Sequence, residues 1–121
     1  MACILVIDDD VAVRRMIRTV LERGGHTVVE AGDGAEGMKL YHAHDVDVVI
    51  TDLYMPGQDG IETIQLLREE APDCRILAIS GGASVGSEGP LRDARMLGAN
   101  DVLAKPFDRA QLLDAVKRLQ P

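Results

Sequence analysis

The sequence predicts an α/β fold in which a five-stranded parallel sheet is flanked by five helices on its two faces. Short apolar runs of strand length alternate with longer segments of helical period. The interiors of the apolar runs are largely uncharged, which fits strands that are buried on both faces of a parallel sheet. The 121 residues and their 46% hydrophobic content suit one domain with one sizeable core.

The first unit combines a strand over 3–7 (CILVI) with a helix over 11–23. The apolar residues of this helix recur at helical spacing and share one face: Val13, Met16, Ile17, Val20 and Leu21. Gly24 and Gly25 then end the helix, because glycine adopts the backbone conformations that close a helix C-terminus.

The next two units have the same order. A strand over 27–30 (TVVE) precedes a helix over 34–43, and a strand over 46–51 (VDVVIT) precedes a helix over 59–70. Pro72 stops the second of these helices, because proline cannot continue a helix. The residues of that helix expected to face the core are Ile61, Ile64 and Leu67.

The last two units complete the sheet. A strand over 75–79 (RILAI) is followed by a helix that starts at Pro90 and ends at Gly98. A strand over 101–104 (DVLA) is followed by a helix with Asp108 as its N-cap. The inward-facing residues of this final helix are expected to be Leu112, Leu113, Val116 and Leu119.

The composition excludes several classes of partner. The net charge of −7 and the pI of about 4.8 argue against direct binding to nucleic acid or to a membrane surface, since both favour a basic face. No apolar run approaches membrane-spanning length, and Met1 and Ala2 lead straight into the first strand without a signal peptide. Cys3 and Cys74 are too few for a disulfide framework. We therefore expect a cytoplasmic protein.

Charged or hydroxyl-bearing side chains occur just past four of the five predicted strands. They are Asp8, Asp9 and Asp10 after the first strand, Asp52 after the third, Ser80 after the fourth and Lys105 after the fifth. In parallel α/β sheets, ligands bind outside the carboxyl ends of the strands, where the strand order reverses. The sequence therefore predicts a functional site at this edge of the sheet, with Asp10 serving mainly to cap the first helix.

If the first and third strands are neighbours, Asp8, Asp9 and Asp52 converge on one acidic pocket. Close carboxylates repel unless a cation lies among them, and Mg²⁺ takes oxygen ligands while keeping waters for a phosphate to replace. Lys105 and Ser80 add an ammonium and a hydroxyl, which together with the metal can bind the oxygens of a phosphoryl group. A neighbouring carboxylate can then act as nucleophile and become an aspartyl phosphate.

Two other patterns favour different functions. The glycine-rich segment 32–37 (GDGAEG) matches a dinucleotide-binding fingerprint, although Asp33 and Glu36 put negative charge where a pyrophosphate would lie. Asp8 and Asp10 match the Asp-x-Asp pattern of haloacid-dehalogenase-like phosphatases, with Asp8 as nucleophile and Asp10 as acid. That alternative leaves Asp52 with only an optional role.

Four segments resemble the receiver domain of two-component response regulators, in the same order and over essentially the whole chain. They are VIDDD, ITDLYMPGQDG, AISGG and GANDVLAKPF. The resemblance implies a single flavodoxin-like domain over residues 1–121 with strand order 2-1-3-4-5. It implies a phosphoacceptor that can phosphorylate and dephosphorylate itself, and not an enzyme that acts on other substrates.

The same resemblance implies a role for particular residues. Asp52 is expected to be the phosphoacceptor, and Asp9 is expected to bind Mg²⁺ together with Asp52 and the backbone carbonyl of Tyr54. Asp8 is expected to assist through water. The phosphate-binding and switch residues implied by the resemblance are Ser80, Gly81 and Lys105.

Two further expectations concern the residues around Lys105. The resemblance implies a cis peptide bond between Lys105 and Pro106. The family usually has an aromatic residue three positions before the lysine, where this chain has Val102. Any output through this region must therefore use another mechanism, and the glycine-rich segment 81–89 is a candidate to become ordered on phosphorylation.

The expected partner is a histidine kinase or a histidine phosphotransfer protein. Val11, Arg15 and Arg18 lie at helical spacing on one face beside the acidic pocket, and this face is the expected docking surface. The chain ends at Pro121, directly after the fifth expected helix. The sequence leaves open whether the domain is free-standing or part of a longer protein.

Overall fold

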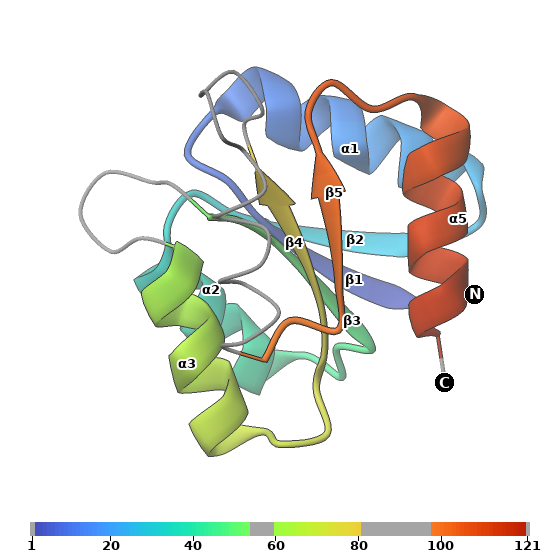
Figure 1. Ribbon diagram of the computed structural model, residues 1–121. Helices are drawn as coiled ribbons and strands as arrows, with labels where there is room; N and C mark the ends of the chain where they lie inside the picture. The colour runs from blue at the N-terminus through green and yellow to red at the C-terminus, as the bar shows by residue number, and fades with distance from the viewer. Residues whose placement is uncertain (1, 54–59, 81–97, 121) are drawn as a thin grey trace.

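A five-stranded parallel sheet forms the centre of the molecule (Figure 1). The computed structural model describes residues 2–53, 60–80 and 98–120. The strands are β1 (Cys3–Ile7), β2 (Thr27–Ala31), β3 (Val48–Asp52), β4 (Arg75–Ser80) and β5 (Asp101–Ala104). Their spatial order is β2-β1-β3-β4-β5, which confirms the expected strand order and makes β1 and β3 neighbours.

Helices cover both faces of the sheet. They are α1 (Val11–Arg23), α2 (Gly34–Ala43), α3 (Gly60–Glu70) and α5 (Arg109–Leu119). Figure 1 shows α1 and α5 on one face and α2 and α3 on the other. Residues 90–97 of the helix expected between Pro90 and Gly98, and the segment 81–89, lie outside the described residues. No helix in the described ranges is long and apolar enough to cross a membrane.

Both predicted N-caps are confirmed. The side chain of Asp10 accepts hydrogen bonds from the amides of Ala12 and Val13 at the start of α1. Asp108 and Gln111 form a reciprocal capping box at the start of α5. Each cap satisfies amide groups that have no partner within the helix, so the helices begin where the sequence predicted.

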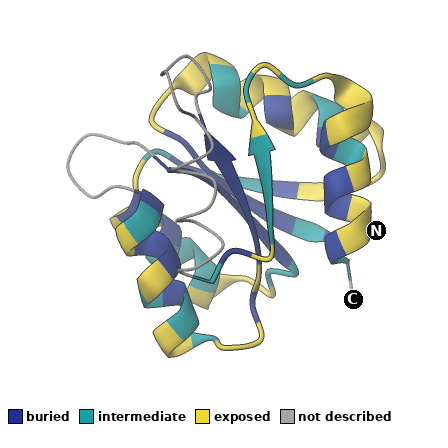
Figure 2. Cartoon of the chain, in the orientation of Figure 1, coloured by how far each residue is buried: buried dark blue, intermediate teal, exposed yellow. Residues whose placement is uncertain are grey.

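The core consists of two clusters of buried side chains, one on each face of the sheet. Successive residues of β1 alternate between them, with Ile4 and Val6 facing α1 and α5, and Leu5 and Ile7 facing α2 and α3. Figure 2 shows that the central strands are buried along almost their whole length. The sheet therefore separates two apolar layers.

The third strand begins later and ends later than the sequence predicted. The Val46 amide donates to the carbonyl of His44, and the Asp47 carboxylate accepts a hydrogen bond from the Cys3 amide. A turn at 44–45 follows α2, and 46–47 lie between this turn and the start of β3 at Val48. At the other end, Asp52 pairs in register with Ile79, so this carboxylate belongs to the strand itself.

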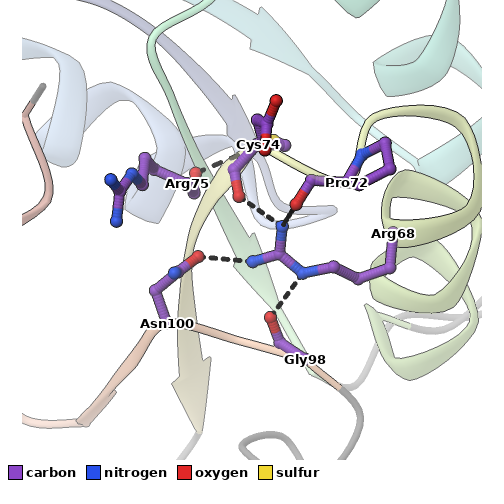
Figure 3. A pocket seen from close by; sticks show the side chains of 7 residues that line it. Arg68, Pro72, Cys74, Arg75, Gly98 and Asn100 are labelled. Atoms are coloured by element: carbon purple, nitrogen blue, oxygen red, sulfur yellow. Dashed lines mark hydrogen bonds between the residues drawn. The ribbon is translucent and has the colours of Figure 1, made fainter.

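Arg68 near the end of α3 ties that helix to the amino ends of β4 and β5 (Figure 3). Its guanidinium donates to the carbonyls of Gly98 at 2.7 Å and Pro72 at 3.0 Å. It also donates to the Cys74 carbonyl and the Asn100 side chain. These bonds satisfy four acceptors that precede the two strands, at the edge of the sheet opposite Asp52.

Candidate functional site

Three carboxylates converge where β1 and β3 end. One oxygen each from Asp8, Asp9 and Asp52 lies within 4.8 Å of the other two. The juxtaposition follows from the parallel pairing of β1 with β3, which brings their carboxyl ends side by side. Asp8 and Asp52 are buried and Asp9 is exposed, so the cluster has a buried base and an open side.

Lys105 places its ammonium against this cluster from the end of β5. Its Nζ lies 3.3 Å from Asp52 Oδ2 and 3.6 Å from Asp8 Oδ2. Partial burial lowers the pKa of Lys105, but the charges of Asp52 and Asp8 outweigh burial and the net pKa is raised. The side chain therefore stays protonated at neutral pH. The peptide bond from Lys105 to Pro106 is cis, as predicted.

The carboxylate of Asp8 is only partly satisfied. Its side chain is 2% exposed, and its Oδ1 accepts a hydrogen bond from the Asp10 amide at 2.8 Å. Its Oδ2 has no hydrogen-bond partner among the described residues, although it faces the ammonium of Lys105. Burial raises the pKa of Asp8, the Asp10 amide opposes that rise, and the nearby Asp52 charge adds to it.

This arrangement suits a hard divalent cation. Three charged carboxylates with one ammonium leave excess negative charge, and a buried oxygen of Asp8 is left without a hydrogen-bond donor among the described residues. A metal ion that prefers oxygen ligands answers both features. The acidic cluster formed by Asp8, Asp9 and Asp52 can therefore bind a metal.

Ser80 is the last residue of β4 and lies beside the end of β5. It is buried, and its Oγ has no hydrogen-bond partner among the described residues. The Lys105 amide donates to the Ser80 carbonyl at 2.8 Å, so the backbones of these two residues are joined. The remaining expected site residues, Tyr54 and Gly81, lie outside the described part of the chain.

The geometry disfavours the phosphatase alternative. That mechanism requires Asp10 to act as an acid close to Asp8. The Asp10 carboxylate instead accepts hydrogen bonds from Ala12 and Val13 and caps α1. It is therefore held at the helix terminus.

The nucleotide-binding alternative over 32–37 is disfavoured as well. Asp33 caps α2 by accepting from the Glu36 amide, and the Glu36 carboxylate accepts from the Gly32 amide. Two carboxylates thus occupy the region where a pyrophosphate would need amide donors. Gly37 has a packing role, because a Cβ there would lie 2.5 Å from the Ile7 side chain.

The three residues of the expected docking surface differ in their surroundings. Val11 is exposed at 46%, and Arg15 is exposed on the same helix. Arg18 is also exposed but pairs with Glu22 at 3.2 Å and Glu30 at 2.9 Å. Val11 and Arg15 are therefore more available to a partner than Arg18 is.

The structure gives roles to two residues to which the sequence assigned none. Arg14 lies outside the apolar face of α1, and its Nη1 donates to the Asp8 carbonyl at 2.8 Å. Gly60 begins α3 and packs against the backbone of Asp52. The available sequence pattern was the glycine that closes the ITDLYMPGQDG segment, but the pattern alone does not show what the glycine contacts.

We expect Gly60→Ala to destabilise the protein. A Cβ at this position would lie 1.7 Å from the carbonyl oxygen of Asp52 and 2.7 Å from the Cα of Leu53. Backbone atoms cannot yield as a flexible side chain can, so α3 or the end of β3 must shift, at a cost of about 1–3 kcal/mol or more. A thermal melt should show a loss of several degrees.

Gly32→Ala is the matched control for this substitution. Among the described residues, a Cβ at Gly32 would meet only the Arg14 side chain, at an ordinary contact distance of 3.5 Å. The control should melt close to the wild type. Equal melting temperatures for Gly60→Ala and Gly32→Ala would show that α3 can move away from Asp52 without cost.

Comparisons with known proteins agree with this geometry. A family model described as the response regulator receiver domain matches residues 4–117. The chain is 34% identical over 116 residues to the chemotaxis protein CheY of Bacillus subtilis, covering 95% of this chain and 94% of that protein. It is 38% identical over 116 residues to the response regulator MprA of Mycobacterium ulcerans, covering 96% of this chain and 49% of that protein.

Solved structures show the same likeness. The crystal structure of a response regulator receiver domain protein from Clostridium thermocellum matches with a TM-score of 0.90 and 29% identity. The match covers 98% of this chain and 94% of that one. The chain thus spans nearly the whole of some relatives and about half the length of others, such as MprA.

Proposed function

The chain belongs to the response regulator receiver domain family, and from this membership we propose that Asp52 is the residue that accepts the phosphoryl group. A receiver domain is a phosphoacceptor module of two-component signalling and not an enzyme that turns over other substrates. The observation that carries the proposal is the position of Asp52, which belongs to the acidic cluster and lies 3.3 Å from the Lys105 ammonium. We further propose that residues 1–121 form a single receiver domain.

In the proposed reaction, a carboxylate oxygen of Asp52 attacks the phosphorus of a phosphohistidine. A P–O bond forms while the P–N bond to the donor breaks, and its electron pair returns to the imidazole nitrogen. Lys105 is placed to bind a phosphoryl oxygen through its ammonium, and the hydroxyl of Ser80 is available as a second donor. Both groups stabilise the charge that spreads over the phosphoryl oxygens.

We propose that Mg²⁺ is the metal of this site. Asp9 and Asp52 of the acidic cluster would hold the ion directly, together with the backbone carbonyl of Tyr54, and Asp8 would assist through water. The ion would supply positive charge to the phosphoryl oxygens. Mg²⁺ fits better than a softer metal because the described ligand set contains only carboxylate oxygen.

Phosphorylation in the presence of Mg²⁺ tests this function directly. Incubation with acetyl phosphate followed by intact-mass measurement should show one added phosphoryl group. Release of phosphate over many turnovers, with no adduct on the protein, would instead support the haloacid-dehalogenase-like phosphatase. If neither an adduct nor released phosphate is found, both assignments are contradicted.

A receiver domain implies a histidine kinase as phosphodonor. We propose that the donor, whether a histidine kinase or a histidine phosphotransfer protein, docks on the exposed face of α1 that carries Val11, Arg15 and Arg18. The exposed Val11 beside two arginines offers an apolar contact with a charged border, next to the acidic site. We place this reaction in the cytoplasm, where receiver domains usually act.

Arg15→Glu should slow phosphotransfer from a phosphohistidine protein by about tenfold or more, because it reverses a charge at the proposed interface. Labelling by acetyl phosphate should not change, since this small donor needs no docking surface. Rates of adduct formation with the two donors measure both effects.

The matched control is Arg23→Glu, an exposed arginine at the far end of α1. This variant should behave like the wild type with both donors. If Arg15→Glu slows both donors equally, the residue serves the site or the fold instead of docking.

A further inference from the structure

Arg14 links the acidic site to the edge strand β2. Its Nη1 donates to the carbonyl oxygen of Asp8 at 2.8 Å, and its Nε donates to Glu30 Oε1 at 3.0 Å. The side chains of Arg14 and Glu30 are only 18% and 17% exposed. A pair that is shielded from water and oriented by two hydrogen bonds holds its geometry better than an exposed ion pair does.

The carbonyl that Arg14 contacts belongs to the peptide bond between Asp8 and Asp9. Because a peptide unit is planar, fixing the direction of its carbonyl also fixes its amide and the backbone from which both side chains start. The Asp8 amide donates to the carbonyl of Ala31 at 3.1 Å, so the other side of Asp8 is already bound to the end of β2. Arg14 completes this restraint.

We propose that Arg14 is a positioning residue of the acidic site and that Glu30 holds it in place. Through the Asp8 carbonyl, Arg14 sets the direction in which the carboxylates of Asp8 and Asp9 meet that of Asp52. Arg14 touches the backbone of a proposed metal ligand and none of the reacting atoms, so its effect is on metal affinity. This inference rests on the proposed metal site.

Arg18 provides a matched control on the same helix. Its Nη1 binds the other carboxylate oxygen of Glu30, Oε2, at 2.9 Å, and its Nε binds Glu22. Arg14 and Arg18 therefore share Glu30, and replacing either arginine by methionine removes an ion pair with this carboxylate. Arg14→Met additionally removes the hydrogen bond to the Asp8 carbonyl.

The experiment compares Mg²⁺ affinity, measured by calorimetric titration, in the wild type, Arg14→Met and Arg18→Met. All titrations are run well below the melting temperature of each protein. We expect Arg14→Met to weaken Mg²⁺ binding about tenfold or more, as removal of a residue that orients metal ligands typically does. Arg18→Met should stay within about twofold of the wild type.

The amide resonance of Asp9 gives an independent readout in the metal-free protein. It should shift in Arg14→Met and stay near its wild-type position in Arg18→Met, because only the first variant frees the peptide unit between Asp8 and Asp9. If Arg14→Met does not fold, Arg14→Lys replaces it. A lysine ammonium cannot reproduce both bonds of the guanidinium, so binding should still weaken about threefold.

Three results would overturn the inference. Mg²⁺ affinity of the Arg14 variant within about twofold of the wild type shows that the bond to Asp8 does not position the ligands. Equal weakening in Arg14→Met and Arg18→Met assigns the effect to the shared Glu30 network. If the wild type itself binds no Mg²⁺, the proposed metal site fails and this inference fails with it. Failure of the role of Arg14 alone is recognised because the wild type then still binds Mg²⁺.

Discussion

Asp52→Asn should abolish the phosphorylated adduct while leaving the fold intact. The amide has nearly the shape of the carboxylate, but it lacks the nucleophilic oxygen that would bond to phosphorus. It also removes one of three clustered negative charges, and the melting temperature without Mg²⁺ should therefore be unchanged or higher. Intact mass after treatment with acetyl phosphate and Mg²⁺, together with a thermal melt, measures both expectations.

Asp73→Asn is the matched control for this substitution. Asp73 is exposed and precedes β4, at the opposite edge of the sheet from Asp52. The control should be labelled as fast as the wild type. The assignment of Asp52 would be contradicted if the Asp52→Asn protein still carried an adduct at the site that is labelled in the wild type. A melting temperature clearly below that of the wild type would contradict it as well.

Asp9→Asn should remove most of the stabilisation that Mg²⁺ gives to the folded protein. A ligand at one hundred times its dissociation constant stabilises the native state by about 2.7 kcal/mol, which appears as a higher melting temperature. Asp9 is the exposed member of the acidic cluster, so the loss of its charge weakens binding without opening a cavity. The measurement is a series of thermal melts at increasing Mg²⁺ concentration.

Asp10→Asn is the matched control, because it makes the same chemical change at the position next to Asp9. Asparagine retains the side-chain oxygen that caps α1, so this variant should fold. Its melting temperature should still rise with Mg²⁺ as in the wild type. If Asp9→Asn responds to Mg²⁺ fully, or if Asp10→Asn loses the response, the ligand assignment is wrong.

The site was predictable to the extent that it depends on where strands end. Carboxylates after 3–7 and 46–51 and the lysine after 101–104 could be placed at one edge of the sheet because parallel strands end on the same side. Their adjacency required β1 beside β3, an order that came from family resemblance and that the structure confirms. Local patterns do not encode which strands pair across long separations.

The contacts of Arg14 and Gly60 could not be predicted in the same way. The periodicity of α1 places Arg14 outside the apolar face, and the path of β2 decides that it meets Glu30 instead of water. The contact with the Asp8 carbonyl depends in turn on how the connection from β1 to α1 folds back over the helix. The closeness of Gly60 to Asp52 depends on how α3 approaches β3. Both are tertiary contacts, which hydrophobic periodicity does not specify.

The division of the core into two clusters has a consequence for how the sequence can diverge. Side chains that pack with α1 and α5 do not share a layer with those that pack with α2 and α3, because the sheet lies between them. Substitutions far apart and without common neighbours affect stability nearly independently. Substitutions in α1, the helix that we propose for docking, can therefore alter partner choice. The packing of the layer under α2 and α3 does not have to change with them.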